Sequence, residues 1–188
     1  DKYLSVRIFW RLHHVDEKLK DIFLNINDWL KYAEAKSATL VAGNGALIFG
    51  LAGVLKSYEL PNLLEYYGYF SIILCIISMV LCLLSVVPSL SMPWESKPEG
   101  TVQSDNLLYF QDIAKYTPIN YLGKLSNKLE LNEQQFTGYQ KDLANQIIIN
   151  AVIACRKYSY FKVAIWFTVT ALISPLGCLV LFVLRVSK

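Results

Sequence analysis

Charged residues are missing from three long windows of this 188-residue chain. No Asp, Glu, Lys or Arg occurs within residues 37–55, 66–94 or 163–184, although charged residues make up 18% of the whole sequence. Crossing the hydrocarbon core of a bilayer as a helix takes about 20 predominantly apolar residues. The windows therefore predict three transmembrane helices, and the hydrophobic content of 54% argues against an ordinary soluble domain.

The lack of charge inside these windows also argues against several functional classes of membrane protein. Proton relays, voltage sensors and many ion-coupled transporters keep ionisable residues at membrane depth. This chain has none in its three apolar windows, so it is a poor candidate for a carrier. Any pore would be lined by hydroxyls, Asn, Gly and backbone groups supplied by several copies.

Catalytic and metal-binding motifs are missing as well. The sequence has no GxSxG, no HExxH and no phosphate-binding glycine loop, and its four cysteines form no CxxC pair. His13, His14 and Glu17 offer too few ligands for a metal site and are typical of a solvated helix face. We expect no enzyme activity, metal or cofactor in these residues; a catalytic domain before Asp1 is a weaker alternative.

Proline and glycine do not occur in residues 1–42, where apolar residues recur at alternating steps of four and three. The seam comprises Ile8, Leu12, Val15, Leu19, Ile22, Ile26, Trp29 and Ala33. Such spacing is typical of a coiled coil. It predicts one helix that continues into the first span, with a helix over 131–158 as the nearest partner for the seam.

The remaining water-facing part, residues 95–160, predicts further helices. Leu143, Ile147, Ala151, Ala154 and Tyr158 recur at helical spacing, in a helix from about 131 that continues into the third span, where Pro175 should kink it. Two short helices are expected, over 104–116 with Ser104 or Asp105 as cap, and from Thr117-Pro118 to about 127. The fold class is therefore an all-α membrane protein with two long and two short water-facing helices. The expected segments are 1–36 (heptad helix), 37–55 (first span), 56–65 (external loop), 66–94 (second span), 95–160 (cytoplasmic helices), 161–184 (third span) and 185–188 (external tail).

Lysine and arginine are distributed unevenly along the chain. Residues 1–36 hold seven and residues 95–162 hold eight, whereas residues 56–65 hold only Lys56. Cytoplasmic segments are enriched in these two residue types. The pattern predicts a multi-pass membrane protein with its N-terminus and residues 95–160 in the cytoplasm and with residues 56–65 and the C-terminus outside.

Asn44 is the most polar side chain deep in a predicted span. It could form a hydrogen bond to a neighbouring helix or line a water-filled path. Gly45 and Gly50, with Ala42 and Ala46, provide small residues that would allow helices to approach closely or line a pore.

Three blocks of polar and aromatic residues flank the spans. The first block is Trp29–Ser37 (WLKYAEAKS), before the glycine-bearing span; the second is Asn106–Tyr116 (NLLYFQDIAKY); the third is Asp142–Ile147 (DLANQI) with Ala154–Tyr158 (ACRKY). Together, with Tyr121-Leu122 as part of the second block, they resemble, in order, the motifs of the Pycsar-effector transmembrane family, over about residues 25–185. Glu34 stands where that family usually has Asp, which preserves the charge.

The resemblance implies a bacterial antiphage role. Members of that family respond to nucleotide second messengers made after infection and then damage the inner membrane, which stops growth before the phage matures. The implied partners are the lipid bilayer, further copies of the chain, a cyclic nucleotide or oligonucleotide messenger, and an upstream or adjacent nucleotide cyclase. Direct binding of nucleic acid is not expected, and the resemblance supplies no ligand site residue by residue.

The polar residues of the three blocks allow two interpretations. Glu34, Asp112 and Asp142, together with Trp29, could form a network that holds the water-facing helices together. Alternatively, Lys36, Lys115 and Lys157, with Gln146, could bind the phosphate of a messenger. Two functions likewise stay open: a signal-gated effector that disrupts the membrane, and a non-gated anchor whose coiled coil recruits a signalling enzyme.

Overall fold

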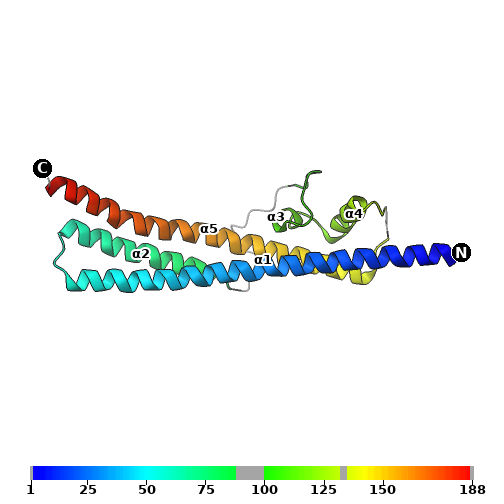
Figure 1. Ribbon diagram of the computed structural model, residues 1–188, viewed down its shortest axis with the longest axis horizontal. Helices are drawn as coiled ribbons and strands as arrows, with labels where there is room; N and C mark the ends of the chain where they lie inside the picture. Colours follow the sequence, from blue (N-terminus) through cyan, green and yellow to red (C-terminus); the bar gives the residue numbers. More distant parts are fainter. Residues whose placement is uncertain (1, 88–99, 132–134, 187–188) are drawn as a thin grey trace. The chain divides into compact units, whose positions relative to one another are not determined.

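The computed structural model describes residues 2–87, 100–131 and 135–186, with side chains from Val15 onward apart from 181, 182, 185 and 186 (Figure 1). It contains five helices: α1 (Lys2–Ser57), α2 (Asn62–Leu84), α3 (Phe110–Ile113), α4 (Pro118–Lys128) and α5 (Gly138–Val186). No strand occurs in these ranges. The all-α class is confirmed, and helices α1, α2 and α5 are long and apolar enough to cross a membrane. The exact bounds of the three spans stay predictions.

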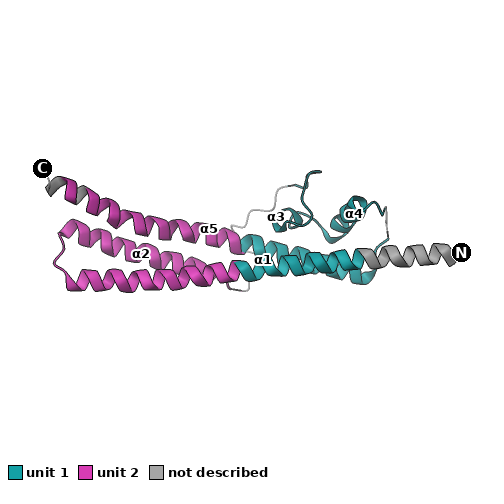
Figure 2. Ribbon diagram, viewed as in Figure 1, with its two compact units in different colours: residues 1–32, 89–156 teal, residues 33–88, 157–188 magenta. Residues whose placement is uncertain are grey.

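The chain divides into two units, coloured separately in Figure 2. Unit 1 comprises residues 1–32 and 89–156, and unit 2 comprises residues 33–88 and 157–188. Unit 1 contains α3 and α4, while unit 2 contains α2 and the apolar windows. Helices α1 and α5 contribute residues to both units and are unbroken at the boundary.

Unit 2 carries large apolar side chains on its outside. Its interior contains Leu74, Cys75 and Ala171, whereas Phe49 is 81% exposed and Trp166 is 64% exposed. Soluble proteins rarely expose apolar patches on this scale. The distribution fits three helices that pack on small residues and present their larger side chains to lipid.

Unit 1 is held by the predicted seam of α1. Val15, Leu19, Ile22 and Ile26 are all buried, as are Ala144, Ile147 and Ala151 of α5 at helical spacing. Two side-chain hydrogen bonds join the same helices: Gln140 Nε2 donates to Asp16 Oδ1 at 2.9 Å, and Asn150 Nδ2 donates to Asn27 Oδ1 at 2.8 Å. From Val15 onward the seam is thus buried, and two bonds join its helix to α5 within unit 1. The cytoplasmic location of these helices stays a prediction, and the side chains of Ile8 and Leu12 lie outside the described part.

The predicted helix over 104–116 is wrong, because only Phe110–Ile113 is helical and its N-cap, Tyr109, makes no side-chain cap bond. Asp105 does not cap it. Its carboxylate instead accepts a hydrogen bond from the Val102 amide at 2.8 Å, and Asp112 accepts one from the Asn106 amide at 3.0 Å. Carboxylates that bind nearby amides offer the backbone an alternative to helix, which explains the irregular segment.

The other boundaries follow local capping chemistry. Helix α4 begins at Pro118 with Thr117 as N-cap, as predicted. Helix α5 begins at Gly138 rather than near 131, because Thr137 and Gln140 form a reciprocal capping box. The Gln140 amide donates to Thr137 Oγ1 at 3.2 Å, and the Thr137 amide donates to Gln140 Oε1 at 3.0 Å. Helix α5 continues through Pro175 to Val186. Helix α2 ends at Leu84, and the last part of the predicted second span, 88–94, lies outside the described residues.

Candidate functional site

Two of the three predicted phosphate-binding lysines lie in unit 2, where both have partners. Lys157 Nζ donates to Glu34 Oε1 at 2.6 Å, and its side chain is only 10% exposed. Lys36 Nζ lies 5.4 Å from the ring centroid of Tyr158 and 5.8 Å from that of Phe161. The ion pair and the cation–π contacts both link α1 to α5.

The third lysine, Lys115, lies in unit 1 between two carboxylates. Its ammonium is 2.7 Å from Asp112 Oδ1 and 3.2 Å from Asp105 Oδ1. These bonds raise the pKa of Lys115, and the bond from Lys115 is the main cause that lowers the pKa of Asp112. The pKa of Asp105 falls to about 2, chiefly because its carboxylate accepts the Val102 amide and secondarily because Tyr116 and Lys115 donate to it.

These contacts favour the structural interpretation of Lys36, Lys115 and Lys157, since each ammonium already has a partner within the chain. Glu34 and Asp112 belong to the predicted network. Asp142 and Gln146, by contrast, are exposed on α5 and form no hydrogen bond or ion pair with any side chain that the structure describes.

Trp29 packs against the start of α3, at Tyr109 and Phe110. Its ring centroid lies 5.4 Å from that of Phe110 and 6.4 Å from that of Tyr109, and the latter pair is edge to face. The heptad spacing places Trp29 on the seam but does not predict this aromatic partner. The cluster ties α1 to the second of the three sequence blocks.

A hydrogen-bonded polar cluster lies among the apolar helices of unit 2. Asn44 Nδ2 donates to Ser78 Oγ at 2.9 Å, and Thr168 Oγ1 donates to Asn44 Oδ1 at 2.9 Å. Ser78 Oγ also donates to the Ala164 carbonyl at 2.8 Å, and all three side chains are buried. Asn44 therefore bonds to α2 and α5, the first of the two roles predicted for it.

The prediction of close packing at Gly45 and Gly50 is not met within one chain. A Cβ added at either glycine would meet no atom within 4 Å, and Ala42, Ala46 and Gly50 are exposed. The physical reason is that α1 presents Asn44, and not its small residues, to α2 and α5. Close approach occurs instead at Gly68 of α2, where an added Cβ would lie 2.8 Å from Leu55 Cδ2.

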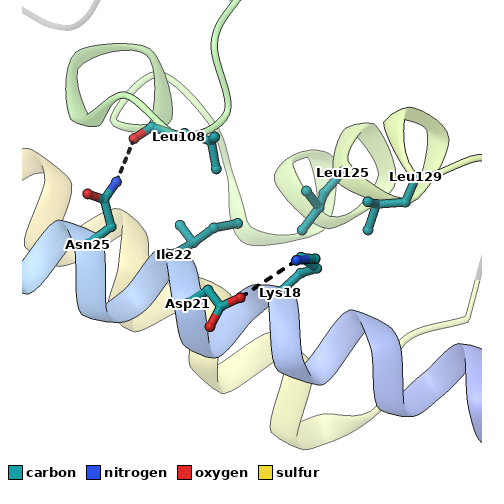
Figure 3. Close-up of a pocket in the computed structure, with 7 residues that line it drawn as sticks. All are labelled: Lys18, Asp21, Ile22, Asn25, Leu108, Leu125 and Leu129. Atoms are coloured by element: carbon teal, nitrogen blue, oxygen red, sulfur yellow. Dashed lines mark hydrogen bonds and ion pairs between the residues drawn. The ribbon is translucent and has the colours of Figure 1, made fainter.

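Unit 1 has a mainly apolar groove of about 550 Å³, which we call the apolar groove (Figure 3). Asn25 Nδ2 donates to the Leu108 carbonyl at 3.1 Å along one side, and Lys18 forms an exposed ion pair with Asp21 at 3.7 Å. The groove is lined by Lys18, Asp21, Ile22, Asn25, Leu108, Leu125 and Leu129. Lys18, the one cation in this lining, is paired with Asp21, so the groove is better suited to an apolar ligand than to an anion.

A second and more polar groove of about 890 Å³ runs along α4; we call it the α4 groove. Lys124 Nζ donates to the Tyr116 hydroxyl at 2.7 Å and to the Val102 carbonyl, and Lys128 Nζ donates to the Asp105 carbonyl at 2.7 Å. The lining comprises Thr101, Gln103, Ile119, Asn120, Gly123, Lys124, Asn127, Lys128 and Phe136. This groove was not predicted from the sequence, although Asn120, Lys124 and Asn127 recur at helical spacing in the predicted helix that starts at Thr117-Pro118.

Comparison with known proteins identifies the family. A family model described as the Pycsar effector protein domain matches residues 18–185. The Pycsar effector protein PtPycTM of Propioniciclava tarda is 28% identical over 165 residues, which cover 85% of this chain and 73% of that protein. The Pycsar effector protein RsPycTM of a Rhizobium species is 30% identical over 138 residues, 72% of this chain and 77% of that protein.

No solved structure matches the chain significantly. The family model nonetheless covers α2, most of α1 and α5, and both grooves. The family resemblance seen in the sequence is thereby confirmed, and the chain belongs to the Pycsar effector transmembrane family of antiphage defence proteins.

Proposed function

We propose that this protein is an effector that permeabilises the bacterial inner membrane when a nucleotide second messenger binds it, and so arrests the infected cell. The observation that carries the proposal is the family match across residues 18–185, which includes three helices long and apolar enough to span a bilayer. The chain itself acts without enzymatic chemistry in this scheme. A separate nucleotide cyclase supplies the messenger.

The continuity of two helices supports the gating step. Helices α1 and α5 each pass without a break from unit 1 into unit 2. A ligand that binds two conformations of unit 1 with different affinity shifts the equilibrium between them. In our proposal the shift pulls on α1 and α5, separates Asn44 from Ser78 and Thr168, and exposes these polar groups to water.

Several copies act together in the proposed open state. Three helices of one chain are too few to enclose a wide aqueous pore, and the small residues Ala42, Ala46 and Gly50 are exposed on α1. Small residues allow membrane helices from separate chains to approach closely. We place the N-terminus and unit 1 in the cytoplasm, where the messenger is made, following the distribution of lysine and arginine.

The anchor alternative receives less support. An anchor would need an unoccupied coiled-coil seam with which to recruit an enzyme. Val15, Leu19, Ile22 and Ile26 are already buried within the chain.

Induced expression in bacteria tests the proposal. Cells that carry the effector and an active cyclase should lose a potential-sensitive dye signal within minutes of induction, while cells with the effector and a catalytically inactive cyclase should keep it. Polarised membranes under both conditions, with the effector present at equal levels, would contradict the proposal and favour the anchor.

A further inference from the structure

The α4 groove contains positive charge that no carboxylate of the described residues pairs with. Lys124 and Lys128 form no ion pair with any residue that the structure describes; they donate to two carbonyls and to the Tyr116 hydroxyl. The Lys124 ammonium also lies 5.3 Å from the centroid of the Tyr116 ring, a cation–π contact that leaves its charge unneutralised. This separates them from Lys115, which lies between two carboxylates. Among the five charged groups that these contacts involve, Lys115, Lys124 and Lys128 outnumber Asp105 and Asp112 by one.

The ammonium groups of Lys124 and Lys128 have hydrogen-bond donors that their described contacts do not use. A lysine ammonium has three N–H donors. Lys124 uses two of them and Lys128 uses one, which leaves three donors among the described contacts. The two lysines lie four residues apart on α4, a spacing at which helical side chains are neighbours. Paired ammonium groups with unused donors are suited to the oxygens of a phosphate.

The rest of the groove suits the base of a nucleotide. Asn120, Asn127 and Gln103 present amide groups that can pair with the edge of a base, and Phe136 offers an aromatic ring. Gly123, in the middle of the α4 face, has open space where a side chain would begin. The volume of about 890 Å³ lies within the range of small-molecule sites, roughly 300–1,000 Å³.

The opposite face of α4 fixes the position of these groups. Tyr121, Leu122 and Leu125 are buried, and Tyr121 donates a hydrogen bond to the Leu107 carbonyl at 2.8 Å. Tyr116 also joins the groove to the buried loop, because it accepts a bond from Lys124 and donates one to Asp105 at 2.9 Å. The lysines therefore extend from a rigid support, which lowers the entropic cost of binding.

We propose that the α4 groove is the messenger site, in which Lys124 and Lys128 bind the phosphate of a nucleotide while Asn120, Asn127 and Phe136 hold its base. The inference rests on the proposed function and replaces Lys36, Lys115 and Lys157 as phosphate ligands. Ligand binding also engages the Lys124–Tyr116–Asp105 chain of hydrogen bonds, which gives the groove a connection to the loop at 102–105.

Binding to the full chain in detergent tests the site. The probes are the 3′,5′-cyclic monophosphates of adenosine, guanosine, cytidine and uridine, with inorganic phosphate and vesicles of anionic phospholipid as separate arms. Lys124→Gln and Lys128→Gln each keep a donor for the carbonyls and remove the charge. We expect each to weaken binding of at least one cyclic nucleotide by tenfold or more, since charge-assisted bonds to phosphate are about twice as strong as neutral ones. Lys20→Gln, an exposed lysine of α1 outside the groove, is the matched control and should bind as the parent does.

Gly123→Leu provides a test that removes no contact. The new side chain enters open space on α4 and fills the groove, so it should abolish binding while the melting temperature stays at or above that of the parent. Parental affinity in both lysine variants and in Gly123→Leu would overturn the site and leave the proposed function standing. Failure of every nucleotide to bind the parent chain would overturn both, as would lysine-dependent binding confined to the lipid vesicles.

Discussion

Replacing Asn44 by Ala should weaken the membrane bundle by a small and calculable amount. The change removes two bonds between helices, Asn44 Nδ2 to Ser78 Oγ and Thr168 Oγ1 to Asn44 Oδ1, both 2.9 Å long. The remaining hydroxyls are not left without partners. Ser78 still donates to the Ala164 carbonyl at 2.8 Å, and Thr168 lies 2.9 Å from Ser78 and 3.4 Å from the same carbonyl.

The expected loss of stability follows from these contacts. Hydrogen bonds between membrane helices contribute about 0.6 kcal/mol each on average, so two bonds amount to roughly 1.2 kcal/mol. The full penalty for an orphaned buried group, about 1–3 kcal/mol, does not apply. If the cluster stabilises only the closed form, the ratio of open to closed protein should rise about sevenfold, since 1.4 kcal/mol corresponds to a tenfold change in an equilibrium constant.

The assay combines unfolding and leakage. Asn44→Ala should lower the free energy of unfolding in detergent by about 1 kcal/mol and should raise the basal permeability of cells that lack any messenger. Thr170→Val is the control. Among the described residues, the Thr170 hydroxyl bonds only to the Trp166 carbonyl of its own helix, at 2.9 Å. If both variants match the parent in stability and permeability, the cluster does not hold the bundle closed and the reasoning fails.

Three further perturbations test other parts of the account. Trp29→Ala should lower the stability in a thermal melt by about 3 kcal/mol, near the low end for buried Trp because the ring is only partly buried. The control, Leu24→Ala, should cost little because Leu24 is 61% exposed. Equal melting temperatures of the two variants would show that the aromatic cluster does not stabilise the protein. The contacts of Asp105 lower its pKa from an ordinary 3.8 to about 2 in the folded protein, so they stabilise the fold when the carboxylate is charged. The free energy of unfolding should therefore be constant above about pH 4 and should decline between pH 4 and 2. Asp105→Asn should flatten that decline and exposed Asp142→Asn should not; identical acid profiles would contradict the assignment. In a background without native cysteines, Glu59→Cys should react with a membrane-impermeant maleimide in intact cells while Gln111→Cys is protected; labelling of both from outside would refute the proposed orientation.

The features that were predicted correctly depend on local patterns. The alternating steps at Val15, Leu19, Ile22 and Ile26 predict a buried seam because burial repeats with the helical period. Thr117-Pro118 predicts the start of α4 because the hydroxyl and the proline ring act on adjacent residues. The three apolar windows predict spans through length and composition alone.

The features that were missed depend on which distant residues meet. Glu34 and Lys157 are 123 residues apart, and no sequence pattern shows that their charges pair at 2.6 Å. The segment 104–116 has helical composition, yet Asp105 and Asp112 capture backbone amides and interrupt it. Lys124 and Lys128 look like ordinary solvated lysines until the loop at 101–105 is placed beside α4.

Messenger-dependent leakage through a lipid bilayer tests the proposed activity without other cell components. The full chain is reconstituted into vesicles that contain a small fluorescent dye, and each of the four cyclic nucleotides is added in turn. The account predicts dye release with one or more nucleotides and none without, with Lys128→Gln requiring at least tenfold more nucleotide for the same rate. Vesicles that stay sealed with every nucleotide, or that leak equally in their absence, would contradict a messenger-gated effector.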